Sequence, residues 1–131
     1  MDFELFIDFA KEQEIHGVRD WNKTFSSHRR PVLRLKDSKT KKVAGQLVLA
    51  VDDSEAWIYF FAVDPTIRGA GLGTRLITAA EKYCKSIGVE TIKLNPQKEF
   101  EDRLVPWYEK LGYIKTTRNE KNNEWEMYKE I

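Results

Sequence analysis

The stretch Phe60–Thr74, FFAVDPTIRGAGLGT, decides the fold of this chain because it joins three kinds of backbone structure. An apolar strand pattern leads into a loop containing Gly69, Gly71 and Gly73, and a helical pattern begins at Leu72. Glycines permit tight turns and let backbone N–H groups approach a ligand closely. The first turn of a helix adds unpaired N–H donors and a partial positive charge. The stretch therefore predicts a strand, an anion-binding loop and a helix, with phosphate as the anion that suits such a loop.

Two nucleotide-binding motifs do not fit the spacing of these glycines. A dinucleotide fingerprint requires a small residue three positions after its second glycine, where this chain has Thr74. A Walker loop requires Gly-Lys followed by Ser or Thr, and no such triplet occurs. The glycine loop instead resembles the Q/R-x-x-G-x-G/A motif of the GNAT superfamily of acetyl-CoA-dependent N-acyltransferases. The residues that carry this resemblance are Arg68-Gly69-Ala70-Gly71-Leu72-Gly73.

The composition is that of a globular protein, and we expect residues 1–131 to form one domain. Hydrophobic residues make up 41% and charged residues 33% of the 131 residues, enough for a core without disulfides or metals. The net charge is only +1, whereas nucleic-acid binders show a basic excess, so no such partner is expected. One cluster, interpreted as a solvated hairpin tip or else as a contact for coenzyme phosphates, comprises Lys36, Lys39, Lys41 and Lys42.

Cysteine usage and hydropathy limit the cellular setting. Cys84 is the only cysteine, which excludes an intrachain disulfide and any multi-cysteine metal site, and we expect no metal. No apolar run approaches the roughly 20 residues that a membrane-spanning helix needs. The N-terminal MDFELFIDF also lacks the basic region that opens a signal peptide. We therefore expect an intracellular protein of the cytoplasm, with the nucleus left open and no membrane partner.

The first half of the chain predicts two helices followed by three strands. Apolar residues recur at helical spacing over Met1–Gln13 and again over Ile15–Phe25. The period then becomes that of strands, which short turns join as an antiparallel meander of Val32–Leu35, Val43–Val51 and Glu55–Val63. In the third strand, simple alternation predicts one face of Glu55, Trp57, Tyr59, Phe61 and Val63 and another of Ala56, Ile58, Phe60 and Ala62.

The second half predicts a crossover and a final hairpin. A helix over Leu72–Ile87 ends at Gly88, and the strand Val89–Leu94 follows. A strand, a crossover helix and a strand form a parallel pair, so the sheet must be mixed. We expect next a helical turn over Glu99–Leu104, a helix that has Pro106 in its first turn and ends at Gly112, and the strands Tyr113–Thr117 and Glu124–Lys129.

A second motif agrees with the glycine loop. The segment Pro106–Tyr113, PWYEKLGY, is similar to the FYEKxGF segment of the GNAT superfamily, and both motifs stand in the family's order. The resemblance covers Val32–Lys129. It implies an α/β (α+β) fold of three layers, with a mixed central sheet, helices on both faces and a parallel strand pair that splays apart to admit the cofactor.

Three features depart from the family pattern. The family's first strand is expected to be absent, because the helical pattern begins near residue 3. Glu101 occupies the position where many members have an asparagine near the cofactor. Trp57 aligns with a catalytic glutamate of some histone-acetylating members. Neither of these two family roles carries over to this chain.

The resemblance implies where acetyl-CoA binds. Backbone groups of Phe61, Ala62 and Val63 would hold the pantetheine arm, and Val63 would also polarise the thioester. The amides of Gly69–Thr74, including Ala70, Gly71, Leu72 and Gly73, would hold the pyrophosphate. Arg68 either contacts a phosphate or is solvated beside it, and Thr74 either supplies an oxygen ligand or is simply a first-turn residue.

Two residues are candidates for acid and base. Tyr108 matches the family's tyrosine near the coenzyme sulfur, which protonates the departing thiolate; the alternative is a half-buried packing aromatic. An amine of pKa around 10 is mostly protonated at pH 7, so its proton must be accepted. Glu55 is the candidate base, directly or through water, or else a solvated residue at a strand start.

The expected function is acetyl transfer from acetyl-CoA to a primary amine, on a small molecule or a protein, by direct attack in a ternary complex. A non-catalytic acyl-CoA-binding module on the same fold is the alternative. Glu12, Glu14 and Asp20 would attract a cationic acceptor, or are an exposed acidic helix face. The sequence leaves the acceptor and the oligomeric state open.

Overall fold

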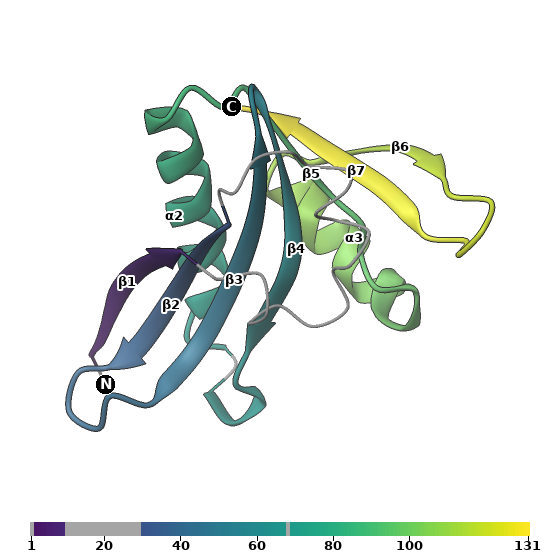
Figure 1. Ribbon diagram of the computed structural model, residues 1–131. Coiled ribbons are helices and arrows are strands. Elements are labelled where there is room, and N and C mark those ends of the chain that lie inside the picture. Colours follow the sequence, from purple (N-terminus) through teal and green to yellow (C-terminus); the bar gives the residue numbers. More distant parts are fainter. Residues whose placement is uncertain (1, 10–29, 68) are drawn as a thin grey trace.

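The computed structural model describes residues 2–9, 30–67 and 69–131 (Figure 1). Within these ranges the chain forms strands, two α-helices and two short 3-10 helices. In chain order they are β1 (Phe3–Phe9), β2 (Pro31–Asp37), β3 (Val43–Asp52), β4 (Glu55–Val63), η2 (Pro65–Ile67), α2 (Leu72–Ser86), β5 (Thr91–Leu94), η3 (Lys98–Phe100), α3 (Glu101–Lys110), β6 (Ile114–Arg118) and β7 (Trp125–Glu130).

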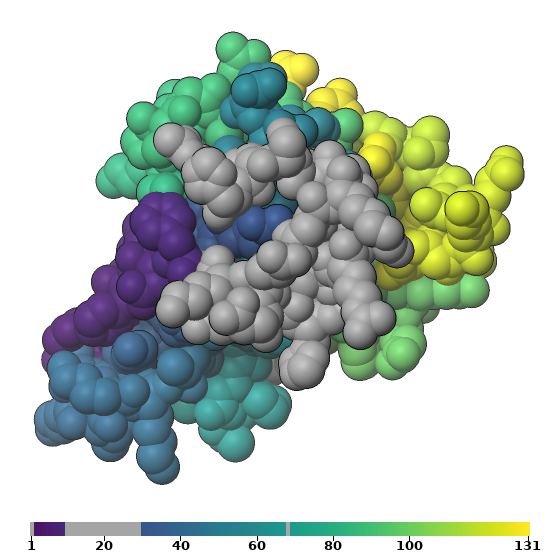
Figure 2. Space-filling model, viewed as in Figure 1, coloured from purple at the N-terminus to yellow at the C-terminus, as the bar shows by residue number. Residues whose placement is uncertain are grey.

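The central sheet is mixed, as predicted. Its strand order is β1-β2-β3-β4-β5-β7-β6, and the first four strands form an antiparallel meander. Strands β4 and β5 are parallel because α2 crosses between them, and the antiparallel hairpin β6–β7 extends the sheet beyond β5. Figure 2 shows β1 and the β6–β7 hairpin at opposite sides of the molecule, as expected for the two edges of the sheet.

The N-terminal segment corrects the helix predicted over Met1–Gln13. Residues 3–9 form strand β1, which pairs with β2 from Phe3↔Asp37 to Phe9↔Pro31. The apolar spacing of this segment fits a helix, but pairing with the free edge of β2 satisfies its backbone hydrogen bonds and determines the outcome. The family's first strand, expected to be absent, is therefore present. The helix predicted over Ile15–Phe25 lies outside the described residues.

The parallel pair splays apart soon after it begins. Strand β4 pairs with β5 only at Glu55↔Thr91, Ala56↔Ile92 and Trp57↔Lys93. Strand β5 ends at Leu94, two residues before Pro96, which has no N–H to donate to a ladder. The rest of β4, from Ile58 to Val63, keeps its pairing with β3 but has no strand on its other edge within the described residues.

A β-bulge at Tyr59 corrects the predicted faces of β4. Val48 pairs with Phe60 and Leu49 pairs with Ile58, so Tyr59 is an extra residue without an opposite partner. The alternation of side chains shifts by one position beyond it. Phe61 and Val63 therefore pack against the same hydrophobic core as Ala56 and Ile58, while Phe60 is 48% exposed.

Both described helices contribute to one hydrophobic core. Leu76, Ile77 and Ala80 of α2 and Val105 and Tyr108 of α3 belong to the same buried cluster as the inner residues of β2, β3 and β4. On the opposite face of the sheet, the buried residues include Val32, Val48 and Ala50. Neither described helix is long and apolar enough to cross a membrane.

Helix α3 differs from its prediction in one respect. The helical turn expected over Glu99–Leu104 and the helix expected from Pro106 are a single helix, Glu101–Lys110, with Pro106 in its interior. Proline lacks the N–H that would bond the carbonyl of Asp102 four residues earlier. The helix therefore contains one local interruption where it borders the splayed strands.

Candidate active site

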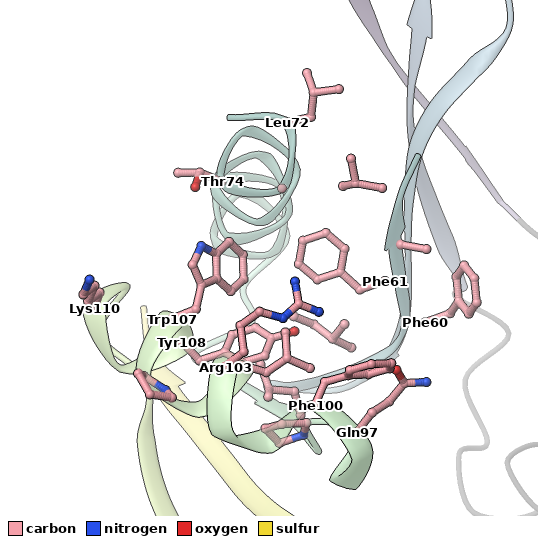
Figure 3. A pocket seen from close by; sticks show the side chains of 18 of the residues that line it. Phe60, Phe61, Leu72, Thr74, Gln97, Phe100, Arg103, Trp107, Tyr108 and Lys110 are labelled. Atoms are coloured by element: carbon pink, nitrogen blue, oxygen red, sulfur yellow. The ribbon is translucent and has the colours of Figure 1, made fainter. Parts of the chain in front are cut away.

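A large cavity lies between β4, the start of α2, the segment after β5 and one face of α3 (Figure 3). Its volume is about 780 Å³, and small-molecule sites typically span about 300–1,000 Å³. Along α3 the lining residues Arg103, Trp107 and Lys110 recur every three or four positions, the spacing of one helix face. The cavity thus occupies the opening made by the splay of β4 and β5.

The glycine loop and the first turn of α2 form one end of the cavity, called here the cradle end. Gly69 and Gly71 have φ values of 92° and 75°, which only glycine adopts at little cost. Gly71 is the N-cap residue of α2, and the first turn has neither a side-chain cap nor an acidic residue. Its N–H donors and the positive end of the helix are therefore available to an anion. This end suits a phosphate group.

The C-terminal half of β4 forms the wall beside the cradle. Phe61, Ala62 and Val63 all line the cavity, on the strand edge that β5 leaves unpaired. Such an edge offers alternating N–H and C=O groups to an extended ligand. The rings of Phe61 and Trp107 lie 6.0 Å apart and bridge the splay from opposite sides. Figure 3 shows both rings directed into the cavity.

Tyr108 lies in the middle of the cavity wall on α3. Its side chain is 6% exposed, and its ring packs edge-on against Trp107 and Tyr113 at centroid distances of 5.0 and 5.7 Å. Burial raises the pKa of its hydroxyl to about 12. The hydroxyl therefore keeps its proton throughout the neutral range and can act as a hydrogen-bond donor.

A polar network supports Tyr108 from behind. The Tyr113 hydroxyl donates to Glu81 Oε2 at 2.8 Å, and Lys129 Nζ donates to Glu81 Oε1 at 3.0 Å. Burial, together with the nearby Glu81 carboxylate, raises the pKa of Tyr113. The network joins α2, β7 and the turn between α3 and β6. It fixes the ring against which Tyr108 packs.

Side chains from separate segments build the far end of the cavity, opposite the cradle. It is lined by Tyr59 and Phe60 of β4, Asn95 and Gln97 after β5, and Phe100 and Arg103 of the helical segment. Phe100 is 45% exposed, and the Arg103 guanidinium lies 5.5 Å from its ring centroid. The far end thus combines apolar aromatic surface with one cationic group.

Most of the predicted cofactor residues meet at this cavity. Those that line it are Phe61, Ala62, Val63, Gly69, Gly71, Leu72, Gly73, Thr74 and Tyr108. Ala70 lies in the same loop but does not line the cavity, and Arg68 lies outside the described residues. Their roles toward a ligand stay predictions.

The predicted base is placed differently. Glu55 lies at the start of β4, away from the cavity lining, and its carboxylate pairs with Lys93 Nζ at 2.5 Å. Cys84 is fully buried in the core, and burial raises the pKa of its thiol to about 12, in keeping with a packing residue.

Several cavity residues were not anticipated from the sequence. Arg103 and Lys110 follow the spacing of the α3 face, which was a usable signal, whereas Asn95, Gln97 and Phe100 come from an irregular segment without one. Glu101, at the family's asparagine position, pairs with Arg118 of β6 at 2.9 Å. That ion pair ties the start of α3 to the C-terminal hairpin.

Comparison with solved structures shows that this chain shares its fold with several acetyltransferases. It is similar to an acetyltransferase from Bacillus subtilis in complex with CoA, with a TM-score of 0.72 and 15% identity over 99% of each chain. It is also similar to the ribosomal-protein-S18-alanine N-acetyltransferase of Escherichia coli, with a TM-score of 0.70 and 21% identity over 98% of this chain and 94% of that one. The match to PaiA N-acetyltransferase from Thermoplasma acidophilum, in complex with coenzyme A, has a TM-score of 0.68 and 18% identity. It covers 76% of this chain and 60% of that one.

The family comparison is more direct than these distant structural likenesses. A search of curated proteins gave no match. The model described as the acetyltransferase (GNAT) family, however, matches residues 3–113. This range contains strands β1 to β5, the glycine loop, α2 and the PWYEKLGY segment. The chain belongs to the GNAT acetyltransferase family.

Proposed function

We propose that this protein transfers an acetyl group from acetyl-CoA to a primary amine by direct attack in a ternary complex. One observation carries the proposal: the uncapped start of α2, the unpaired edge of β4 and the Tyr108 side chain all line the same cavity. Those three features match a diphosphate, an amide-rich pantetheine arm and a thioester, in the order in which coenzyme A carries them. Family membership supports the same assignment.

The coenzyme would lie along the cavity from the cradle toward Tyr108. The amides of Gly69–Thr74 would hold the pyrophosphate, with Arg68 beside it, and the backbone of Phe61–Val63 would hold the pantetheine arm. Fixing the thioester in this way supplies much of the rate, since well-oriented intramolecular reactions gain up to about 7–11 kcal/mol. Binding of the donor is therefore part of the chemistry.

In the chemical step the uncharged amine nitrogen attacks the thioester carbonyl carbon. A backbone N–H near Val63 would donate to the developing oxyanion, a contribution of the kind worth about 2.7–4 kcal/mol in other enzymes. The carbon–sulfur bond then breaks and the amide product keeps the acetyl group. The attacking nitrogen loses one proton and the departing thiolate takes up one, so the reaction yields an amide and free thiol without a net change in protons. Tyr108 would donate a hydrogen bond to that thiolate. A thiol with a pKa near 8.5 leaves readily, so the help from Tyr108 is modest.

Two measurements test this function. Isothermal titration should show acetyl-CoA binding in the micromolar range, and free thiol should appear when an amine panel is added with acetyl-CoA. The proposal fails if acetyl-CoA does not bind the wild type at millimolar concentration. It also fails if Gly71→Glu, which places a carboxylate in the cradle, binds acetyl-CoA as tightly as the wild type does.

A non-catalytic acyl-CoA-binding module remains the second candidate, on one specific observation. None of the described residues that line the cavity is a carboxylate or a histidine, and Glu55 is paired with Lys93 elsewhere. Acetyl-CoA binding without thiol release against every amine would favour this reading. In that case Tyr108→Phe and the wild type would bind acetyl-CoA equally, and neither would release thiol.

A further inference from the structure

Arg103 is placed at the end of the cavity that faces away from the cradle. Trp107 packs against the cradle, since a Cβ on Gly73 would lie 3.5 Å from its ring. Arg103 is four residues earlier on the same helix face, which is about 6 Å further along the axis. Its guanidinium lies over Phe100, one helical turn further still. Figure 3 shows the Arg103 side chain extending into the cavity.

No carboxylate in the described part of the chain forms an ion pair with Arg103. Ion pairs there hold Arg34 to Asp8, Arg118 to Glu101 and Lys129 to Glu81, whereas none involves Arg103. The described residues that line the cavity include no acidic side chain. Contact with the Phe100 ring supports the guanidinium and leaves its N–H groups free to bind an anion.

We propose that Arg103 binds a carboxylate on the acceptor, so that the acceptor is an amine of the amino-acid class with an apolar side chain. This inference rests on the proposed acetyl transfer and names the substrate class for the same site. A planar guanidinium matches a carboxylate in a bidentate pair. Phe60 and Phe100, which are 48% and 45% exposed, supply the apolar surface for the side chain.

The position of Arg103 favours the acceptor over the coenzyme as the source of the anion. The coenzyme's phosphates belong at the cradle, where Lys110 provides a second cation two turns along the helix from Arg103. A cation near the reacting nitrogen also favours the uncharged amine over the ammonium ion. The same field disfavours acceptors with several positive charges, such as polyamines.

The test compares matched acceptors that differ only in the carboxylate. Thiol release is measured with phenylalanine and phenylalaninamide, with leucine and leucinamide, and with 4-aminobutyrate and its amide. The wild type should prefer at least one carboxylate over its carboxamide by tenfold or more in kcat/KM. Arg103→Gln should abolish that preference, mainly through KM, whereas Arg103→Lys should restore part of it. Lys121→Gln, an exposed change in the β6–β7 loop, should leave the preference intact.

A second measurement separates the two sources of the anion. Arg103→Gln should bind acetyl-CoA with an affinity within about threefold of the wild type by isothermal titration. A tenfold or greater loss of coenzyme affinity, with the carboxylate preference retained, would assign Arg103 to the coenzyme and overturn the proposal.

The remaining outcomes are also decisive. If the wild type acetylates carboxamides or polyamines better than every carboxylate, the proposal is wrong while acetyl transfer stands. If acetyl-CoA binds but no amine is acetylated, N-acetylphenylalanine and its amide are titrated into the CoA-loaded protein. Equal affinity for the two compounds would reject the carboxylate site. Failure of acetyl-CoA to bind the wild type would reject the proposed function itself.

Discussion

The two ends of the cavity are built in different ways. The cradle end comes from one contiguous stretch, Gly69–Thr74, and offers backbone N–H groups at the start of α2. The far end comes from side chains of three segments, represented by Phe60, Gln97 and Arg103. Under the proposed function, backbone groups would recognise what every coenzyme A molecule shares, whereas side chains would distinguish one acceptor from another. The proposal thus assigns a general donor site to the cradle end and a specific acceptor site to the far end.

The largest effect is expected from a substitution in the cradle end, which should impair acetyl-CoA binding. Gly71→Glu should weaken acetyl-CoA binding by at least about 100-fold, because it puts a carboxylate where N–H groups receive phosphate and loses charge-assisted hydrogen bonds. Gly88→Glu is the matched control: Gly88 also has positive φ, at 89°, and open space for a side chain, but lies at the other end of α2. Both variants should lose roughly 1–2 kcal/mol of stability from the left-handed backbone. Equal coenzyme affinity of Gly71→Glu and Gly88→Glu would show that Gly71 is not part of a phosphate site.

The next effect lies between the two ends, at Tyr108. Tyr108→Phe should lower kcat by about 10–100-fold, less than many general acids contribute, because the thiolate is a good leaving group. Coenzyme affinity should change little. An unchanged kcat in Tyr108→Phe would show that the tyrosine hydroxyl does not take part in the reaction.

The pH dependence gives an independent check on Tyr108. Since burial raises its pKa to about 12, the acid form of Tyr108 persists below that pH and is lost only above it. The wild-type kcat/KM should therefore rise with pH as the acceptor amine loses its proton and should not fall between pH 8 and about 10. A decline in that interval, absent from Tyr108→Phe, would mean that the hydroxyl ionises at much lower pH in the complex.

A smaller loss of acetyl-CoA affinity is expected from a substitution at Lys110, beside the cradle end. Lys110→Gln should weaken acetyl-CoA binding by about threefold, since an exposed cation contributes only about 0.2–1 kcal/mol. The loss should shrink as salt is raised, because screening removes the same attraction. Acceptor preference should be unaffected. A change in the carboxylate preference would instead connect Lys110 with the acceptor.

The smallest effect on either end is expected from the network behind Tyr108. Glu81→Gln removes the charged partner of Lys129 and weakens the bond to Tyr113, which should cost about 1–3 kcal/mol in unfolding free energy. Urea unfolding measures that loss. Coenzyme affinity and acceptor preference should both stay within about twofold, because Glu81 does not line the cavity. A larger change would give the network a role in ligand binding.

The same contrast explains what the sequence predicted well. Strand β4 and helix α2 begin where their patterns begin, at Glu55 and Leu72, because local periodicity and the glycine loop determine them. Family resemblance added the splay and the position of Tyr108. These features depend on residues close together in the chain.

What was missed depends on distant partners. Strand β1 forms because the edge of β2 is available, and the Glu101–Arg118 pair joins residues far apart in the sequence. Pro106 favours a helix start by itself, yet η3 and Glu101 begin the helix earlier. The far end of the cavity is of this kind as well, because residues from separate segments build it, so its composition required the structure.

The extra residue at Tyr59 has a consequence for how β4 tolerates change. Ahead of it, even-numbered side chains such as Ile58 enter the core, and after it odd-numbered ones such as Phe61 do. Both Ile58 and Phe61 therefore lie against the core, and Phe60, opposite Val48, lies on the other face of the strand. Deleting Tyr59 would leave Phe60 opposite Val48 and Phe61 opposite Leu47, so the same side chains would face the core and only the local bend and twist of the bulge would be lost. A single inserted residue thus shapes the backbone of β4 where the strand lines the cavity.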